Sequence, residues 1–190
     1  MGFFRGDVRL LFEDVVELKP TIFLSVPRLY NKLFDKVMLG VNSSGILKKS
    51  LFRLAYSEKK ALLKRGIFTH WLWDALVFSK VKKALGGRVK CLTTGSAPTS
   101  DEILQFLKIC FSCDVIELYG QTEYGGATNG VLGDASVGHV GLPMLSAEIK
   151  LLDIPEMNYF TSDKPPKGEV MVRATSQFSE YFGVCDFSFF

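Results

Sequence analysis

The chain has 190 residues, 47% hydrophobic and 23% charged, a composition that suits one globular unit with a substantial core. Its net charge of +3 reflects 23 Lys and Arg against 20 Asp and Glu, too small an excess to indicate nucleic-acid binding. No run of about 18 uncharged apolar residues occurs, and the start of the sequence lacks a signal-peptide pattern. We therefore predict neither secretion nor a membrane-spanning helix.

The four cysteines indicate a reducing compartment rather than a disulfide framework, because they are few. Cys110 and Cys113 form a C-x-x-C pair at the end of an apolar helical run, whereas redox pairs usually sit where a helix begins. A zinc site would need two further ligands, and the two histidines, His70 and His139, are isolated in the sequence. We interpret the pair as buried structural cysteines.

The first part of the chain places a short apolar strand between amphipathic helices. Apolar spacing over residues 7–18 predicts a helix that Asp7 caps and that ends before Pro20. Residues 21–26 form an apolar, β-favouring run, and a second helix is predicted from Arg28. The order is helix, buried strand, helix.

A basic amphipathic helix is predicted from Ile46, after a glycine-containing interruption at residues 40–45. Its outer face carries Lys48, Lys49, Arg53, Lys59, Lys60, Lys64 and Arg65. A charged helical face usually meets solvent, so we predict a solvated surface, with contact to acidic lipid headgroups as the alternative.

The middle of the chain repeats the alternation of helix and strand. Apolar residues at helical spacing predict a helix over residues 71–85, which ends at a Gly-Gly pair. A strand is predicted next, at residues 89–93. A capping box from Thr99 to Glu102 predicts the start of the next helix. A further strand at 115–118 follows that helix.

This alternation predicts an α/β fold, in which helices flank a parallel sheet and ligands bind beyond the carboxyl ends of the strands. The tail differs, because residues 147–152 and 168–173 alternate like strands around a Pro-rich polar loop, which predicts a small antiparallel sheet. We expect residues 1–145 to form an α/β portion and residues 146–190 to be the β-rich end of the same domain.

Two small-residue turns at predicted strand ends are the candidates for chemistry. The turn at 93–98 combines hydroxyls, a glycine and small side chains, although a plain strand-to-helix connection has the same composition. In the turn at 119–123, Tyr119 offers a flat face, Thr122 a hydroxyl for phosphate and Glu123 a carboxylate for a hard cation. The alternative makes Tyr119 a core aromatic and Glu123 an early-helix charge. The sequence contains no P-loop or dinucleotide fingerprint.

The sequence Y-G-Q-T-E at 119–123 resembles the Y-G-x-T-E motif of adenylate-forming enzymes, and T-G-S-A-P at 94–98 resembles their upstream adenosine-pocket turn. The order and separation of the two motifs also match. The stretches around 5–7, 19–21 and 26–29 resemble the long-chain fatty acyl-CoA synthetase branch of this superfamily. V-G-L-P at 140–143 and G-E-V at 168–170 fit it as well.

The resemblance implies a two-step ligation, in which ATP and a long-chain fatty acid give an acyl-adenylate that coenzyme A then converts to a thioester. Mg²⁺ would balance the phosphate charge. The implied adenosine-pocket residues are Gly95, Ser96, Ala97 and Pro98. Tyr119 would pack on adenine, Gly120 and Gln121 would contact the nucleotide through their backbone, and Thr122 would bind phosphate. Glu123 would hold magnesium, which makes Thr122 and Glu123 the catalytic candidates.

Several features that the family pattern requires have no counterpart in the sequence. The phosphate loop, the ribose-binding aspartate and the C-terminal domain with its catalytic lysine are absent, and residues 184–190 do not resemble the family. Asp186 is therefore not assigned to ribose. We expect an internal fragment of a larger ligase, inactive in isolation. There are two alternatives. One is an inactive adenosine-binding or interaction module, and the other is an unrelated nucleotide-binding α/β domain.

The resemblance also implies a membrane association that the sequence does not itself display. The full-length protein is expected at the endoplasmic reticulum or peroxisomal membrane, and otherwise in the cytoplasm, with any anchor outside this chain. Gly125 and Gly126 are expected either to border the acyl tunnel or to allow close helix packing.

Overall fold

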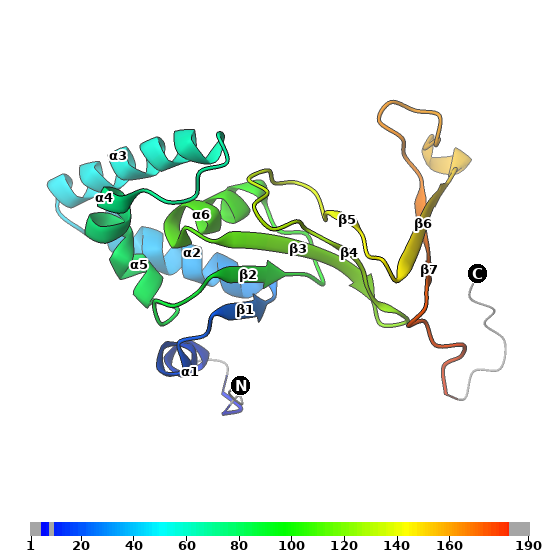
Figure 1. Ribbon diagram of the computed structural model, residues 1–190, viewed down its shortest axis with the longest axis horizontal. Coiled ribbons are helices and arrows are strands. Elements are labelled where there is room, and N and C mark those ends of the chain that lie inside the picture. The colour runs from blue at the N-terminus through cyan, green and yellow to red at the C-terminus, as the bar shows by residue number, and fades with distance from the viewer. Residues whose placement is uncertain (1–4, 8–9, 183–190) are drawn as a thin grey trace. The chain divides into compact units, whose positions relative to one another are not determined.

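The computed structural model describes residues 5–7 and 10–182 (Figure 1). By their contacts the residues group into two compact units, Met1–Glu117 with Val131–His139, and Leu118–Gly130 with Val140–Phe190. The division into domains 1–145 and 146–190 stays a prediction. We describe each unit by itself.

The first unit contains a parallel sheet, as the sequence predicts. Its strands are β1 (Ile22–Ser25), β2 (Cys91–Thr94) and the first half of β3 (Asp114–Gln121). β2 lies between the other two, with Ile22 opposite Cys91 and Cys91 opposite Asp114. The hydroxyl of the fully buried Tyr30 lies 2.9 Å from the carbonyl oxygen of Phe23 and 3.0 Å from that of Thr93, and so links a helix to both strands.

Seven helical segments surround these strands among the described residues. They are α1 (Leu11–Leu18), α2 (Pro27–Asn42), α3 (Ile46–Leu63), α4 (Trp71–Trp73), the π-helical turn η1 (Asp74–Phe78), α5 (Ser79–Lys83) and α6 (Asp101–Phe111). Helices α2, α3 and α5 pack on α6 beside the strands (Figure 1). The core they enclose includes Leu33, Phe78, Leu92, Phe106 and Leu107.

Three predicted helix boundaries are wrong by one to a few residues. Helix α1 begins at Leu11 with Leu10 in the N-cap position, so Asp7 is not the cap. Helix α2 continues through the predicted interruption as far as Asn42. The predicted capping box begins at Thr99, one residue too early. Ser100 is the N-cap of α6, and its side chain accepts a hydrogen bond from the backbone N–H of Ile103.

The prediction that Cys110 and Cys113 are buried is confirmed. Their exposed fractions are 0% and 6%, and both are free thiols. Burial raises the pKa of Cys113 to about 12 and raises that of Cys110 well above its ordinary value. The thiols are therefore protonated and inert at neutral pH, as structural cysteines should be.

The predicted basic face of α3 is solvated only in part. Lys59 is 1% exposed, and its ammonium donates to the Asp74 carboxylate, the Ile109 carbonyl and the Ser112 hydroxyl, each at 2.6 Å. Lys59 lies on the side of α3 that packs on α6, where these acceptors compensate for its lost hydration.

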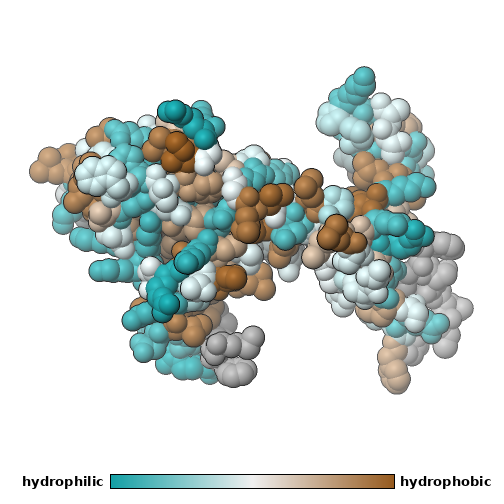
Figure 2. All heavy atoms as spheres, in the orientation of Figure 1, coloured by the Kyte–Doolittle hydropathy of each residue, from teal (hydrophilic) through white to brown (hydrophobic). Residues whose placement is uncertain are grey.

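The outward side of α3 mixes basic and apolar groups. Lys48, Arg53 and Lys60 are exposed there, together with large hydrophobic side chains. Those hydrophobic residues are Ile46, Leu47, Leu51 and Leu54. Hydrophobic and hydrophilic side chains are likewise interspersed over the face of the first unit that Figure 2 shows.

The second unit is antiparallel. The second half of β3 pairs with β4 (Gly125–Asn129), and β4 pairs with β5 (Leu142–Pro143). β6 (Ala147–Leu152) and β7 (Glu169–Ala174) pair along their whole length, joined by a loop that holds the short 3-10 helix η2 (Pro155–Met157). The predicted antiparallel tail is thus confirmed. Among residues 5–7 and 10–182, no helix is long and apolar enough to cross a membrane.

Candidate functional site

The predicted adenosine-pocket turn follows β2 directly in the first unit. Gly95 is partly exposed, whereas Ser96, Ala97 and Pro98 are exposed. Ser96 has φ of 71°, in the left-handed region that non-glycine residues rarely adopt. Such strain persists only where the surroundings impose it, and it is concentrated at ligand sites.

A buried polar cluster beneath this turn supplies that constraint. The backbone N–H of Thr99 donates to the carboxylate of Glu117 at 2.8 Å, and the hydroxyls of Thr94 and Thr99 lie 3.1 Å apart. Thr94, Thr99 and Glu117 are 0%, 7% and 8% exposed. The cluster joins the end of β2, the start of α6 and the middle of β3, so both ends of the turn are held.

Sequence reasoning did not single out Thr99 and Glu117 as supports of the turn. The available signal is Glu117 itself, a carboxylate within the otherwise apolar strand at 115–118. A buried carboxylate requires a donor, and Thr94 lies opposite Glu117 in the register of the two strands.

The Y-G-Q-T-E segment lies in the second unit and differs from the prediction. Tyr119, Gly120 and Gln121 are the last residues of β3, not part of a turn, and the turn occupies residues 122–124. It leads into β4, so Glu123 belongs to a β-hairpin and is not an early-helix charge. Pairing with β4 extends the strand, with an irregularity in register between Tyr119 and Gly120.

Hairpin packing restricts the glycines of this segment. A Cβ atom on Gly120 would overlap the carbonyl oxygen of Gly125, so no other residue fits position 120 without a backbone shift. Gly125 itself has φ of 76°. A Cβ atom on Gly126 would lie 3.1 Å from the sulfur of Met144, which precedes β6. Met144 is not in a helix, so the helix-packing explanation for Gly126 is wrong, while the acyl-tunnel role stays a prediction.

Thr122 and Glu123 present oxygen atoms on the turn. Thr122 is exposed and Glu123 is partly exposed. The Tyr181 hydroxyl donates to the Glu123 carboxylate at 2.6 Å, and this hydrogen bond holds the pKa of Glu123 below its ordinary value. Glu123 is therefore a carboxylate anion at neutral pH.

The segment after β7 braces the same turn. The Ser176 hydroxyl donates to the Tyr124 carbonyl at 2.6 Å, and the Phe178 N–H donates to the Glu123 carbonyl at 3.1 Å. The Phe178 and Tyr181 rings pack edge to face at 4.9 Å. The position of Glu123 is thus fixed by residues more than 50 positions later in the chain.

The donor set of the turn fits a magnesium nucleotide. Within the described parts of the chain, no three His, Cys, Asp or Glu residues gather as a metal cluster. Mg²⁺ commonly takes only one or two protein carboxylates and fills its remaining positions with phosphate oxygens and water. One ionised carboxylate beside an exposed hydroxyl matches that pattern.

The family model described as AMP-binding enzyme matches residues 1–182. The chain belongs to this family. It is 46% identical over 184 residues to the peroxisomal long chain acyl-CoA synthetase 7 of Arabidopsis thaliana, covering 96% of this chain and 26% of that protein. It is 44% identical over 183 residues to human long-chain-fatty-acid–CoA ligase 1, covering 95% of this chain and 26% of the ligase. The chain thus spans about a quarter of the length of these relatives.

Solved structures of adenylation domains show the same fold. The adenylation domain of the carboxylic acid reductase of Segniliparus rugosus, bound to AMP and a co-purified carboxylic acid, aligns with a TM-score of 0.61 at 24% identity. The match covers 95% of this chain and 24% of that one. The corresponding domain from Mycobacterium chelonae aligns with a TM-score of 0.58 at 27% identity. That match covers 93% of this chain and 24% of the other. These alignments confirm the α/β assignment, and the sequence identities to the two relatives confirm the resemblance to long-chain acyl-CoA synthetases.

Proposed function

We propose that this chain carries part of the nucleotide site of a long-chain fatty acid–CoA ligase. The observation that carries the proposal is the exposed turn that presents the Thr122 hydroxyl beside the ionised Glu123 carboxylate. It is supported by 46% identity to a long chain acyl-CoA synthetase. The reaction would consume ATP and a long-chain fatty acid, and coenzyme A would accept the acyl group.

The proposed roles follow the chemistry of each group. Gly95, Ser96, Ala97 and Pro98 would line the adenosine pocket through exposed, small side chains. Tyr119 would pack on adenine, while Gly120 and Gln121 would contact the nucleotide through backbone atoms. Thr122 would donate to phosphate, and Glu123 would hold Mg²⁺, which supplies charge neutralisation at the phosphates.

The reaction requires positioning more than a protein nucleophile. A fatty-acid carboxylate oxygen attacks the α-phosphorus of ATP and pyrophosphate leaves. The coenzyme A thiolate then attacks the acyl carbonyl carbon and AMP leaves. No Ser-His or Cys-His pair is needed, which is consistent with the protonated, buried state of Cys110 and Cys113.

Two further properties of the whole protein are part of the proposal. We infer association with the peroxisomal or endoplasmic reticulum membrane, and the peroxisomal names of two relatives support the first of these locations. We also expect the chain by itself to be inactive, because it spans 26% of the first of these relatives.

ATP–pyrophosphate exchange with palmitate and Mg²⁺ tests the assignment. The chain and a version extended to the length of its curated relatives are assayed in parallel, each also as Glu123→Gln. Glu156→Gln is the matched control, because Glu156 is an exposed glutamate on η2 outside both motifs. We expect exchange only in the extended protein, lost in Glu123→Gln and retained in Glu156→Gln.

Two results would redirect the assignment. Binding of ATP by calorimetry without exchange in any version would favour an inactive adenosine-binding or interaction module. Absence of both exchange and ATP binding in the extended protein would refute a ligase and an adenosine pocket alike.

A further inference from the structure

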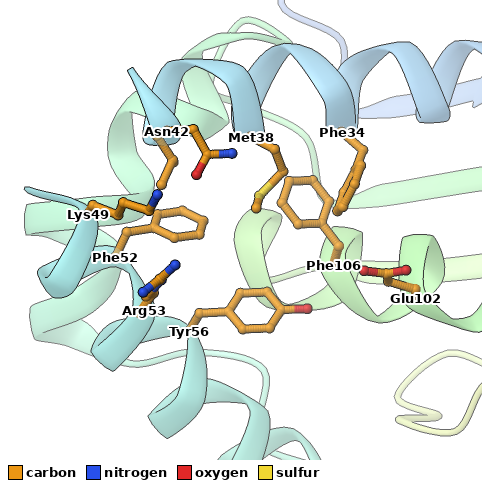
Figure 3. Close-up of a pocket in the computed structure, with 10 residues that line it drawn as sticks. Phe34, Met38, Asn42, Lys49, Phe52, Arg53, Tyr56, Glu102 and Phe106 are labelled. Atoms are coloured by element: carbon orange, nitrogen blue, oxygen red, sulfur yellow. The ribbon is translucent and has the colours of Figure 1, made fainter. Parts of the chain in front are cut away.

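A cavity of about 220 Å³ opens in the first unit (Figure 3). It lies among α2, α3 and α6, which contribute Met38, Phe52 and Phe106 respectively, among other residues. None of its lining residues belongs to 95–98 or 119–123. The proposed nucleotide site therefore does not account for this cavity.

Aromatic rings form its walls and hold one another in place. Phe34 packs edge to face on Phe106 with ring centroids 4.8 Å apart, and Tyr56 stacks near Phe106 at 6.5 Å. Phe52 lies 6.1 Å from Tyr56 and packs on the buried Phe78 at 5.7 Å. Walls braced by such contacts belong to a preformed cavity, one that needs little rearrangement to accept an apolar group.

The cavity has charged groups at opposite ends. In Figure 3, Lys49 and Arg53 lie at one end, with the Asn42 amide nearby, and Glu102 lies at the other. Within residues 5–7 and 10–182, the ammonium of Lys49 and the guanidinium of Arg53 have no hydrogen-bond or ion-pair partner. Two unpaired cations beside an apolar cavity favour an anion there, whereas Glu102 would repel one at the opposite end.

We propose that this cavity binds a small amphiphilic carboxylate, with its apolar body between the aromatic walls and its carboxylate at Lys49 and Arg53. The volume equals that of about seven water molecules at ~30 Å³ each, which suits a body of about six to eight carbons. An inorganic anion would leave the aromatic walls unused, and the alkyl chain of a long-chain fatty acid exceeds the cavity. The cavity shares no lining residue with the two motifs, and the proposal does not depend on ligase activity.

Calorimetric titration of the chain with octanoate, below its micelle concentration, tests this site. We expect saturable binding with a dissociation constant of about 1 mM, and weaker binding of octanol, which lacks the charge. Arg53→Met should weaken octanoate binding about fivefold, the size expected for one exposed charge pair, and leave octanol unchanged. Arg53 is exposed, so the substitution should not disturb folding.

Lys48→Met is the matched control, because Lys48 is an exposed lysine on the same helix that does not line the cavity. It should leave octanoate binding unchanged. The location is checked by NMR with ¹³C-methyl methionine, where octanoate should shift the Met38 resonance, assigned through Met38→Leu. Equal affinity for octanol, an unchanged affinity in Arg53→Met, or an unshifted Met38 resonance would each overturn the proposal. None of these outcomes bears on ATP–pyrophosphate exchange, so the two proposals fail separately.

Discussion

Removing the carboxylate of Glu117 should loosen the turn that carries the proposed adenosine pocket. Glu117→Leu leaves the N–H of Thr99, a residue 7% exposed, without its acceptor. A buried donor left unpaired costs about 1–3 kcal/mol, so we expect the free energy of unfolding of the first unit to fall by about 2 kcal/mol. Glu117→Gln keeps an oxygen that can accept the same bond, and should cost less than about 1 kcal/mol.

Urea unfolding followed by tryptophan fluorescence measures this difference, because Trp73 is 8% exposed and reports on the same unit. With a slope of about 2 kcal/mol per molar urea, the midpoint should fall by about 1 M in Glu117→Leu and by less than half of that in Glu117→Gln. Equal midpoints for the two variants would refute the reasoning. That result would mean that the hydrogen bond to Thr99 does not stabilise the turn.

Three further substitutions have defined outcomes. Lys59→Met leaves the Asp74 carboxylate without its buried partner and should lower the free energy of unfolding by about 3 kcal/mol; a urea midpoint equal to wild type would contradict this. Ser96→Gly should exceed Ser96→Ala in stability by about 1 kcal/mol, because only glycine adopts φ of 71° without strain, and equal melting curves would count against a strained turn. Tyr181→Phe should raise the pKa of Glu123 towards 4.5, so that the carboxylate protonates at higher pH in an NMR titration; an unchanged midpoint would exclude the Tyr181 hydrogen bond.

The parallel arrangement could be predicted because the pattern that indicates it is local. Short apolar runs bounded by turn residues coincide with β1 and β2, and the helix predicted between the second and third strands is α6. The tail was predictable for the same reason, since alternation over β6 and β7 needs no knowledge of a distant partner.

The errors arose where a distant partner decides the outcome. From the sequence, Lys59 is predicted to be a surface lysine on a basic helix. Only the positions of Asp74, Ile109 and Ser112 in the fold show that it is buried and paired. From the sequence, Tyr119 is predicted to start a turn. The strand in fact continues because it pairs with β4, whose sequence G-G-A-T-N lacks the apolar alternation that would predict a strand. Helical or strand periodicity carries no information about either contact.

The glycine and the acidic residue of the Y-G-Q-T-E motif support function to different degrees. A Cβ atom on Gly120 would overlap the Gly125 carbonyl, so the hairpin alone requires glycine there, whether or not a nucleotide binds. No comparable packing demand acts on Thr122 or Glu123, because the first is exposed and the second is only partly buried. The Glu123 carboxylate accepts a hydrogen bond from the Tyr181 hydroxyl, which stabilises its ionised form rather than burying it in an apolar surrounding. A turn that presents an ionised carboxylate and an exposed hydroxyl gains little packing stability from either, so these two residues carry more weight for nucleotide chemistry than Gly120, which lies within β3.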